Sequence, residues 1–213
     1  MQSPTETKPR WERRKDARPQ ELLAAALELF TDRGFAATRL EDVARAAGVS
    51  KGTLYLYFEN KQELFKAVVR ENVVHLIGEA EEELAAGANM SSEALLRAMM
   101  EKWWSHAANR KLAGLTKLMM AESGNFPELA QFYEEEVHER ANALLTRVLE
   151  RGVKSGEFRP FDPHVMMQVL TAPILMLMMW THSFFPCEKQ EVDPDVFMAT
   201  FLELIKRGLA PEK

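Results

Sequence analysis

Cysteine is almost absent from this sequence, because Cys187 is the single one among 213 residues. One cysteine excludes an internal disulfide framework, and no signal peptide opens the chain, so we expect an intracellular, cytoplasmic protein. The few histidines, such as His106, His138 and His164, are too scattered for the spacing of metal ligands. We therefore predict no metal site, and we assign Cys187 no role.

Sequence signatures of enzymes and of strands are scarce as well. The chain has no phosphate-binding glycine loop and no dinucleotide-binding fingerprint, so we predict that it is not an enzyme and uses no cofactor. No stretch shows the sustained alternation of apolar and polar residues that a half-buried strand requires. Apolar residues recur instead at spacings of three and four, a pattern that predicts an all-α protein.

Positive charge is in deficit over the whole chain but not at its N-terminal end. The net charge is −5, yet residues 1–70 carry 13 Lys and Arg against 10 Asp and Glu. Six basic residues fall within eleven positions: Lys8, Arg10, Arg13, Arg14, Lys15 and Arg18. We interpret residues 1–17 as a basic, flexible N-terminal arm suited to phosphate or minor-groove contact. A solvated tail that aids solubility is the alternative.

Capping and glycine signals divide the N-terminal part into helices. The predicted helices span residues 19–33, 38–48, 50–58 and 60–87. Gly34 stops the first, and the capping-box pattern from Thr38 to Glu41 opens the second. Ser50 and Asn60 cap the third and fourth. Later helices are predicted to start at Ser91 or Ser92, near Pro127, at Asp162 and at Asp193, with connections at 87–89, 123–125, 152–156 and 185–193.

The segment from Leu40 to Phe58 predicts two short helices joined by a glycine-containing turn, which is the helix-turn-helix arrangement. Apolar residues on both helices and in the turn pack them together: Val43, Ala47, Val49, Leu54 and Phe58. On the opposite side, small and polar residues occupy the first turns of the second helix, the part that enters a major groove. We assign residues 18–65 to a DNA-binding domain and residues 66–213 to a larger helical domain.

Nine residues are predicted to contact DNA: Thr38, Arg39, Ser50, Lys51, Gly52, Thr53, Tyr55, Tyr57 and Lys61. Lys51 reaches a phosphate or a guanine edge, and Thr53 reaches a base edge or a thymine methyl. Tyr57 and Lys61 reach phosphates, and the free N–H groups of the helix that starts at Lys61 favour an anion. Tyr55 is expected to pack partly against the domain. For Arg39, a solvated position is an equal alternative.

The stretch from Pro19 to Val68 resembles the TetR family of bacterial regulators. The strings Ala-Ala-Gly-Val-Ser-Lys-Gly-Thr-Leu-Tyr and Tyr-Phe-Glu-Asn-Lys-Gln-Glu-Leu carry the resemblance. It implies a three-helix DNA-binding head, a long connecting helix and a larger helical C-terminal domain. It also implies that this larger domain dimerises through a four-helix interface of the last two helices and often binds a small molecule.

Methionine and aromatic residues are concentrated in the larger domain, where 11 of the 12 methionines lie at or beyond Met90. Such side chains line adaptable pockets for apolar or aromatic ligands. The predicted pocket residues are Trp103, Trp104, Met119, Met120, Phe126, Tyr133, Met167 and Trp180. For each of them a place in the ordinary core is the alternative.

The most apolar stretch, residues 165–185, is about as long as a membrane span. Polar residues such as Gln168 and Thr171 interrupt it, and neither flank carries clustered Lys or Arg, so we predict no membrane contact. The helices at 162–184 and 193–209 are predicted instead to form the surface of a homodimer. Pro173 is a possible kink in the first of them.

The leading hypothesis is a homodimeric transcriptional repressor that binds a palindromic double-stranded DNA operator. A small, largely apolar ligand in the C-terminal domain would release it by changing the spacing of its two heads. One alternative keeps the DNA-binding head but makes the protein a ligand-independent activator or an architectural DNA binder. Another, from a different class, is a helical lipid-binding protein.

Overall fold

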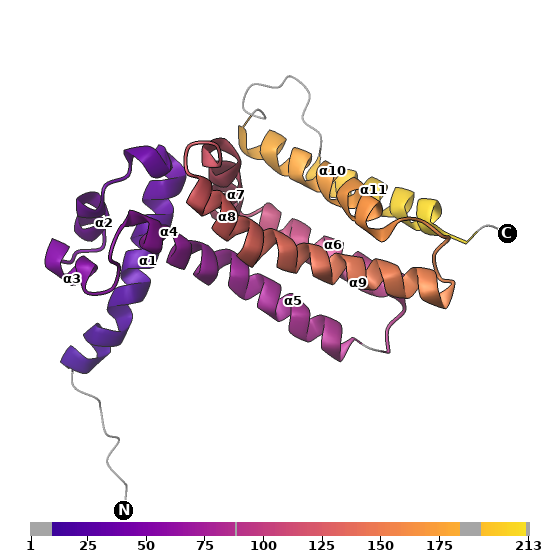
Figure 1. Cartoon of the computed structure of the whole chain (residues 1–213), viewed down its shortest axis with the longest axis horizontal. Coiled ribbons are helices and arrows are strands. Elements are labelled where there is room, and N and C mark those ends of the chain that lie inside the picture. Colours follow the sequence, from indigo (N-terminus) through magenta and orange to yellow (C-terminus); the bar gives the residue numbers. More distant parts are fainter. Residues whose placement is uncertain (1–9, 88, 184–192, 212–213) are drawn as a thin grey trace, which may run out of the picture. The chain divides into compact units, whose positions relative to one another are not determined.

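The computed structural model describes residues 10–87, 89–183 and 193–211, and the regular structure in these ranges is entirely helical (Figure 1). The all-α prediction is thus confirmed. Contacts divide the chain into two compact units, Met1–Glu71 and Asn72–Lys213. The first unit holds α1 Arg10–Ala37, α2 Leu40–Ala46, α3 Lys51–Tyr55 and α4 Lys61–Val69. The second holds α5 His75–Ala86, α6 Ser92–Ala107, α7 Arg110–Glu122, α8 Pro127–Tyr133, α9 Glu139–Ser155, α10 Pro163–Ser183 and α11 Pro194–Leu209.

Helix α1 begins earlier than the predicted start at Pro19, which lies inside it. Residues 10–17, about half of the predicted flexible arm, are helical. Arg, Lys, Glu and Ala have a high intrinsic helix propensity, which does not depend on an apolar face. The remaining arm residues, 1–9, lie outside the described part of the chain. Gly34 interrupts the helix as predicted, with φ 83° and ψ 165°.

The first unit, which we call the head, is built on three aromatic rings. Phe30, Phe35 and Phe65 lie with their ring centroids 5.3–5.6 Å apart, and all three side chains are fully buried. Edge-to-face aromatic pairs contribute about 0.5–1.5 kcal/mol each beyond the burial of their area. Leu22 of α1 and Leu54 of α3 complete this core. This core positions α2 and α3 within the head.

Polar side chains cap the helices largely where the sequence predicts. Ser50 accepts a hydrogen bond from the Thr53 amide at 3.1 Å, and Asn60 accepts one from the Glu63 amide at 2.8 Å. Ser91 and Asp193 cap α6 and α11 in the same way. Asn109, which caps α7, was not among the predicted helix starts.

The predicted long helix from Asn60 is present but is not uniform. Its helical residues follow one another without a gap from Lys61 to Ala86, and the turn Arg70–Val74 is π-helical. A second π-helical turn, Glu134–His138, separates α8 from α9. Such turns insert one extra residue into a helix and often lie at functional sites.

The second unit is a helical bundle in which α9 packs against α5, α6 and α10. The predicted connection at 152–156 is wrong at its first four residues, because α9 continues to Ser155, and Gly152 is buried inside it. The ring of Phe158 lies over this glycine, and a Cβ added to Gly152 would lie 2.1 Å from the Phe158 Cδ2. The absence of a side chain at Gly152 therefore lets Phe158, in the segment after α9, pack against this helix. The helix ends at Gly156, in the left-handed conformation.

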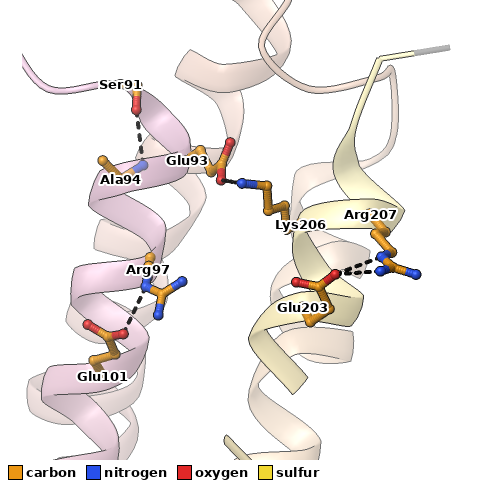
Figure 2. A network of polar contacts seen from close by, with 8 residues as sticks. All are labelled: Ser91, Glu93, Ala94, Arg97, Glu101, Glu203, Lys206 and Arg207. Atoms are coloured by element: carbon orange, nitrogen blue, oxygen red, sulfur yellow. Dashed lines mark hydrogen bonds and ion pairs between the residues drawn. The ribbon is translucent and has the colours of Figure 1, made fainter. Parts of the chain in front are cut away.

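The last helix is joined to α6 at the surface of this bundle (Figure 2). Lys206 of α11 forms an ion pair with Glu93 of α6 at 3.0 Å. Arg97 with Glu101 and Arg207 with Glu203 form further pairs within each helix. Exposed ion pairs of this kind each contribute about 0–1 kcal/mol. The attachment of α11 therefore depends mainly on buried apolar residues, among them Met198, Leu202 and Ile205.

Among the described residues, α10 is the one helix with the length and apolar composition to cross a membrane. Its side chains Met167, Leu170 and Ile174 are buried in the core of the bundle. The helix continues through Pro173.

Candidate DNA-binding surface and ligand cavity

Helices α2 and α3 form a helix-turn-helix around a tight turn at Gly48. The Val49 amide donates to the Ala44 carbonyl at 2.9 Å, and Gly48 has φ +67°. That conformation disfavours a residue with a Cβ, so a glycine is required there. Val43, Ala44 and Leu54 are buried beneath the turn. The other faces of α3 are left free to meet a partner.

The exposed side of α3 carries most of the predicted DNA-contact residues. Ser50, Lys51, Gly52 and Tyr55 are exposed, and Thr53 is half-buried. The Ser50 and Thr53 hydroxyls lie 2.8 Å apart, so Ser50 both caps α3 and fixes its neighbour. The small residues let a DNA backbone approach the start of the helix.

Lys51 is held in place by a carboxylate of α2. Its Nζ donates to Oε1 of Glu41 at 2.5 Å and lies 5.7 Å from the centre of the Tyr55 ring. The hydrogen bond with Glu41 raises the pKa of Lys51 and lowers the pKa of Glu41, so both remain charged at neutral pH. Glu41 was not among the predicted site residues, because the sequence signal assigned it to a capping box.

Three large side chains follow one another on the surface at the end of α3. The exposed fractions are 45% for Tyr55, 83% for Leu56 and 37% for Tyr57. Tyr55 is thus more exposed than expected for a packing residue. Leu56 was not among the predicted contact residues, and its exposure is unusual for a leucine beside two tyrosines. The three form an apolar and hydroxyl-bearing edge suited to base methyls and phosphates.

Two predicted contact residues are turned into the head instead. Thr38 is 1% exposed, and its hydroxyl donates to the carbonyls of Gly34 at 2.8 Å and Leu29 at 3.1 Å. It does not cap α2, whose N-cap residue is Arg39, itself exposed. The capping-box prediction is therefore wrong at this position, because α2 begins one residue later, after Arg39, and the Thr38 hydroxyl is bonded to α1.

Lys61 is engaged in the same region. Its Nζ donates to the backbone carbonyls of Phe35 at 2.7 Å, Ala36 at 3.1 Å and Thr38 at 3.1 Å. It also lies 4.5 Å from the centre of the Phe35 ring. The ammonium, which carries three donors, thus lies against the end of α1. In the structure this side chain therefore has a structural role at the end of α1, and its predicted phosphate contact stays a prediction.

The string Gly48–Gly52 matches Gly-x-Ser-x-Gly, the spacing of a hydrolase nucleophile elbow. That elbow joins a strand to a helix, whereas this string joins two helices. Ser50 caps α3, and residues 1–71 contain no histidine to activate it. Within the head the string therefore has no catalytic arrangement.

The second unit contains a cavity of about 730 Å³, within the usual range for small-molecule sites. Apolar side chains from five helices make up most of its wall: Leu76, Ile77, Leu84, Leu95, Met99, Met100, Leu112, Leu144, Leu145, Leu175 and Met178. Both π-helical turns contribute to the lining, the first through Asn72 and Val73 and the second through Val137 and His138. The composition suits a largely apolar ligand.

Three of the predicted pocket residues line this cavity: Trp103, Tyr133 and Met167. The other five do not. Trp104 and Met119 are buried in the core, while Met120 and Trp180 are 56% and 40% exposed. Phe126 is the N-cap residue of α8 and is half-buried. Each differs from its prediction because residue type alone does not tell which face of a helix meets the cavity.

A few polar groups interrupt the apolar wall. Tyr133 Oη and Thr116 Oγ1 lie 3.2 Å apart, and burial raises the pKa of Tyr133, so the phenol stays neutral. Lys102 of α6 donates to Glu83 at 2.5 Å and lies 3.6 Å from Glu79. His106, one turn beyond Lys102, also lines the cavity. Among the described residues no cluster of three His, Cys, Asp or Glu side chains forms a metal site.

A second surface feature lies on the last two helices. Val165, Val169 and Met176 of α10 are 56–60% exposed, and Val196 and Leu204 of α11 are 61% and 64% exposed. A groove between the helices is lined by Met166, Pro173, Phe197 and Phe201. This apolar face belongs to α10 and α11, the two helices predicted to form the dimer surface.

Comparison with known families agrees with the division into head and bundle. Residues 22–68 match the family model of bacterial regulatory proteins of the tetR family, and residues 89–194 match a tetracyclin repressor-like C-terminal domain. The HTH-type transcriptional regulator YhgD of Bacillus subtilis is 30% identical over 194 residues, which cover 89% of this chain and 95% of the relative.

Two further similarities involve named regulators. The HTH-type transcriptional repressor KstR2 of Rhodococcus jostii is 33% identical over 150 residues, covering 68% of this chain and 70% of that protein. The crystal structure of FadR from Bacillus subtilis in complex with stearoyl-CoA superposes with a TM-score of 0.74 at 25% identity. That similarity covers 89% of this chain and 98% of FadR.

Proposed function

This chain is a DNA-binding transcriptional regulator that belongs to the TetR family, and we propose that it acts as a homodimeric repressor. In this proposal its two heads bind a palindromic operator, and a small, largely apolar ligand in the cavity releases them. The observation that carries the proposal is the pairing of two features in one chain. The head presents α3 with an exposed polar face, and the second unit contains a largely apolar cavity.

The proposed DNA contacts are the exposed residues on and beside α3. Lys51 and Thr53 face bases or phosphates, Ser50 and Gly52 allow close approach, and Arg39, Tyr55 and Tyr57 meet the backbone at the rim of the groove. Glu41 holds the Lys51 ammonium until a phosphate or a base edge competes for it. Thr38 and Lys61 support this surface by fixing the end of α1.

Dimerisation is proposed to occur through the exposed apolar face of α10 and α11. A two-fold dimer formed there would carry two heads, as half-sites about 34 Å apart require. Placing a charge in this face, as in Leu204→Asp, should produce monomers with weakened operator binding. Leu56→Asp is the control for the oligomeric state, since Leu56 is a leucine of the head that is exposed even more than Leu204, 83% against 64%. Sedimentation velocity should show a dimer for Leu56→Asp and a monomer for Leu204→Asp.

Ligand response is proposed because the cavity is large, apolar and lined by the turn Arg70–Val74 through Asn72 and Val73. That turn lies in the helical run that leads out of the head. A ligand that prefers the DNA-free conformation must weaken operator affinity, and the operator must weaken ligand affinity by the same factor. Equal ligand affinity with and without operator would rule out this coupling.

The first test of the proposal is selection of genomic DNA with the purified protein, followed by titration of the recovered site at several salt concentrations. A palindromic site with strong sequence preference supports the regulator and gives the half-site spacing. Weak, sequence-independent binding that moderate salt abolishes would contradict it, since phosphate contacts alone give that behaviour. As a bacterial regulator of this kind acts on the chromosome, we also propose a cytoplasmic location.

A second test asks whether apolar compounds bind. A ligand that binds only the folded protein raises its melting temperature, so a broad panel of small apolar compounds should contain stabilisers that also release the operator. If the operator binds specifically and no compound stabilises the protein, the regulator is a ligand-independent activator or an architectural binder instead.

A further inference from the structure

One residue that lines the cavity carries a buried polar atom with no partner among the described residues. Three buried side-chain nitrogen or oxygen atoms lack a hydrogen bond among the described residues, and of these only Nε2 of His106 belongs to a residue that lines the cavity. Buried polar atoms are nearly always paired, because an unpaired one costs about 1–3 kcal/mol. Such an atom on a residue that lines a largely apolar cavity points to a partner supplied from within the cavity.

The charges that face His106 indicate what kind of group this is. Lys102, one turn away on α6, is engaged by two carboxylates of α5, Glu83 at 2.5 Å and Glu79 at 3.6 Å. The ammonium is therefore more than neutralised, and no cation among these neighbours remains to receive an anionic ligand. Burial lowers the pKa of His106, so its imidazole is neutral at pH 7 and offers hydrogen bonding without charge.

Building on the proposed ligand response, we propose that the cavity selects an uncharged, largely apolar molecule carrying a hydrogen-bonding oxygen, and that Nε2 of His106 binds that oxygen. A carbonyl or hydroxyl oxygen accepts from Nε2–H. In the other tautomer a hydroxyl donates to Nε2. The apolar wall supplies most of the affinity, and His106 fixes the orientation, as a few polar groups do in most small-molecule sites.

The test uses four probes with the same apolar body: naphthalene, 2-naphthol, 2-acetylnaphthalene and 2-naphthoate. Their dissociation constants are measured by calorimetry and by quenching of tryptophan fluorescence, since Trp103 lines the cavity. We expect one or both neutral oxygen probes to bind more tightly than naphthalene, and 2-naphthoate to bind more weakly than 2-naphthol. The better of the two neutral probes distinguishes a hydroxyl from a carbonyl ligand.

His106→Phe removes the hydrogen bond but keeps a planar ring. The ratio of the dissociation constants of naphthalene and the better oxygen probe should fall about tenfold in this variant, the value of one ordinary hydrogen bond. His106→Gln, which retains a hydrogen-bonding group, should restore part of the ratio. His164→Phe should leave it unchanged, because His164 is exposed on α10 outside the cavity lining.

The charge argument is tested separately with Glu83→Gln. This variant releases one of the two carboxylates that engage Lys102, so binding of 2-naphthoate should improve relative to 2-naphthol. An unchanged ratio of naphthalene to oxygen probe in His106→Phe, or tighter binding of 2-naphthoate by the native protein, overturns the proposal and leaves the ligand-responsive repressor standing. Binding of none of the four probes overturns the proposal together with the ligand response.

Discussion

Replacing Lys61 with methionine should destabilise the head while leaving its DNA contacts in place. The ammonium donates to three carbonyls at the end of α1, at 2.7–3.1 Å, so Lys61→Met removes three charge-assisted hydrogen bonds at once. Methionine keeps most of the apolar stem, so loss of packing is small. The effect therefore reports the ammonium alone.

The magnitude follows from the environment of the three acceptors. A hydrogen bond to a charged group contributes about 1.5–3 kcal/mol net, and contributions that share one donor group are not additive. The bond to Ala36 is exposed, so water replaces it readily, whereas the bonds to Phe35 and Thr38 are partly buried. We expect the free energy of unfolding of the head to fall by about 2–4 kcal/mol.

Hydrogen exchange measured by mass spectrometry resolves this loss within the head. The slowest amides of α1 and α4 should exchange about 30- to 700-fold faster in Lys61→Met, the factor that corresponds to the expected loss. Lys51→Met is the control, because Lys51 is exposed and touches only the surface of the head. If Lys61→Met exchanges like the native protein and instead flattens the salt dependence of operator binding, Lys61 contacts phosphate and the structural role is refuted.

Three further predictions follow from single residues. Lys51→Met should weaken operator binding and reduce the slope of log affinity against log salt by about 0.9, measured by titration over a salt series, if Lys51 neutralises one phosphate. Gly48→Ala should destabilise the head by about 1–2 kcal/mol because φ is +67° there. Gly52 lies in α3 with space for a Cβ, so Gly52→Ala should not lower the midpoint of urea unfolding and should only weaken operator binding; equal unfolding midpoints for the two variants would contradict this. Burial lowers the pKa of His106 from 6.5, so the folded protein binds fewer protons at this site than the unfolded chain, and its contribution to stability should fall as pH drops below 6.5. Between pH 7.5 and 5.5, the free energy of unfolding should accordingly decrease less in His106→Phe than in the native protein.

The features that the sequence predicts well are those encoded over a few residues. The caps at Ser50 and Asn60 each join a side chain to an amide three residues further on, so residue type and spacing suffice to place them. The turn at Gly48 is equally local, because its conformation requires a glycine whatever packs around it. For the same reason the sequence predicts the helix-turn-helix and identifies most of the residues on its exposed side.

The lining of the cavity depends on contacts between helices that are distant in sequence. Trp103 and Trp104 are adjacent in α6, yet the first lines the cavity and the second is buried in the core. Successive residues of a helix point about 100° apart, so composition and periodicity locate an apolar face without telling which neighbour it meets. Methionine content could predict that a pocket exists but could not assign its residues.

Two lysines of the head show how this limit affects function. Lys51 and Lys61 both stand at the start of a helix, and sequence reasoning predicts a phosphate contact for each, with a guanine edge as the alternative for Lys51. The acceptors that separate them lie elsewhere in the chain: Glu41 on the exposed side of α2, and the carbonyls at the end of α1. An exposed carboxylate can be displaced by a phosphate, because water and salt screen the pair. Partly buried carbonyls are not replaced as partners of Lys61 without opening the head, so we predict that Lys51 and not Lys61 contacts DNA.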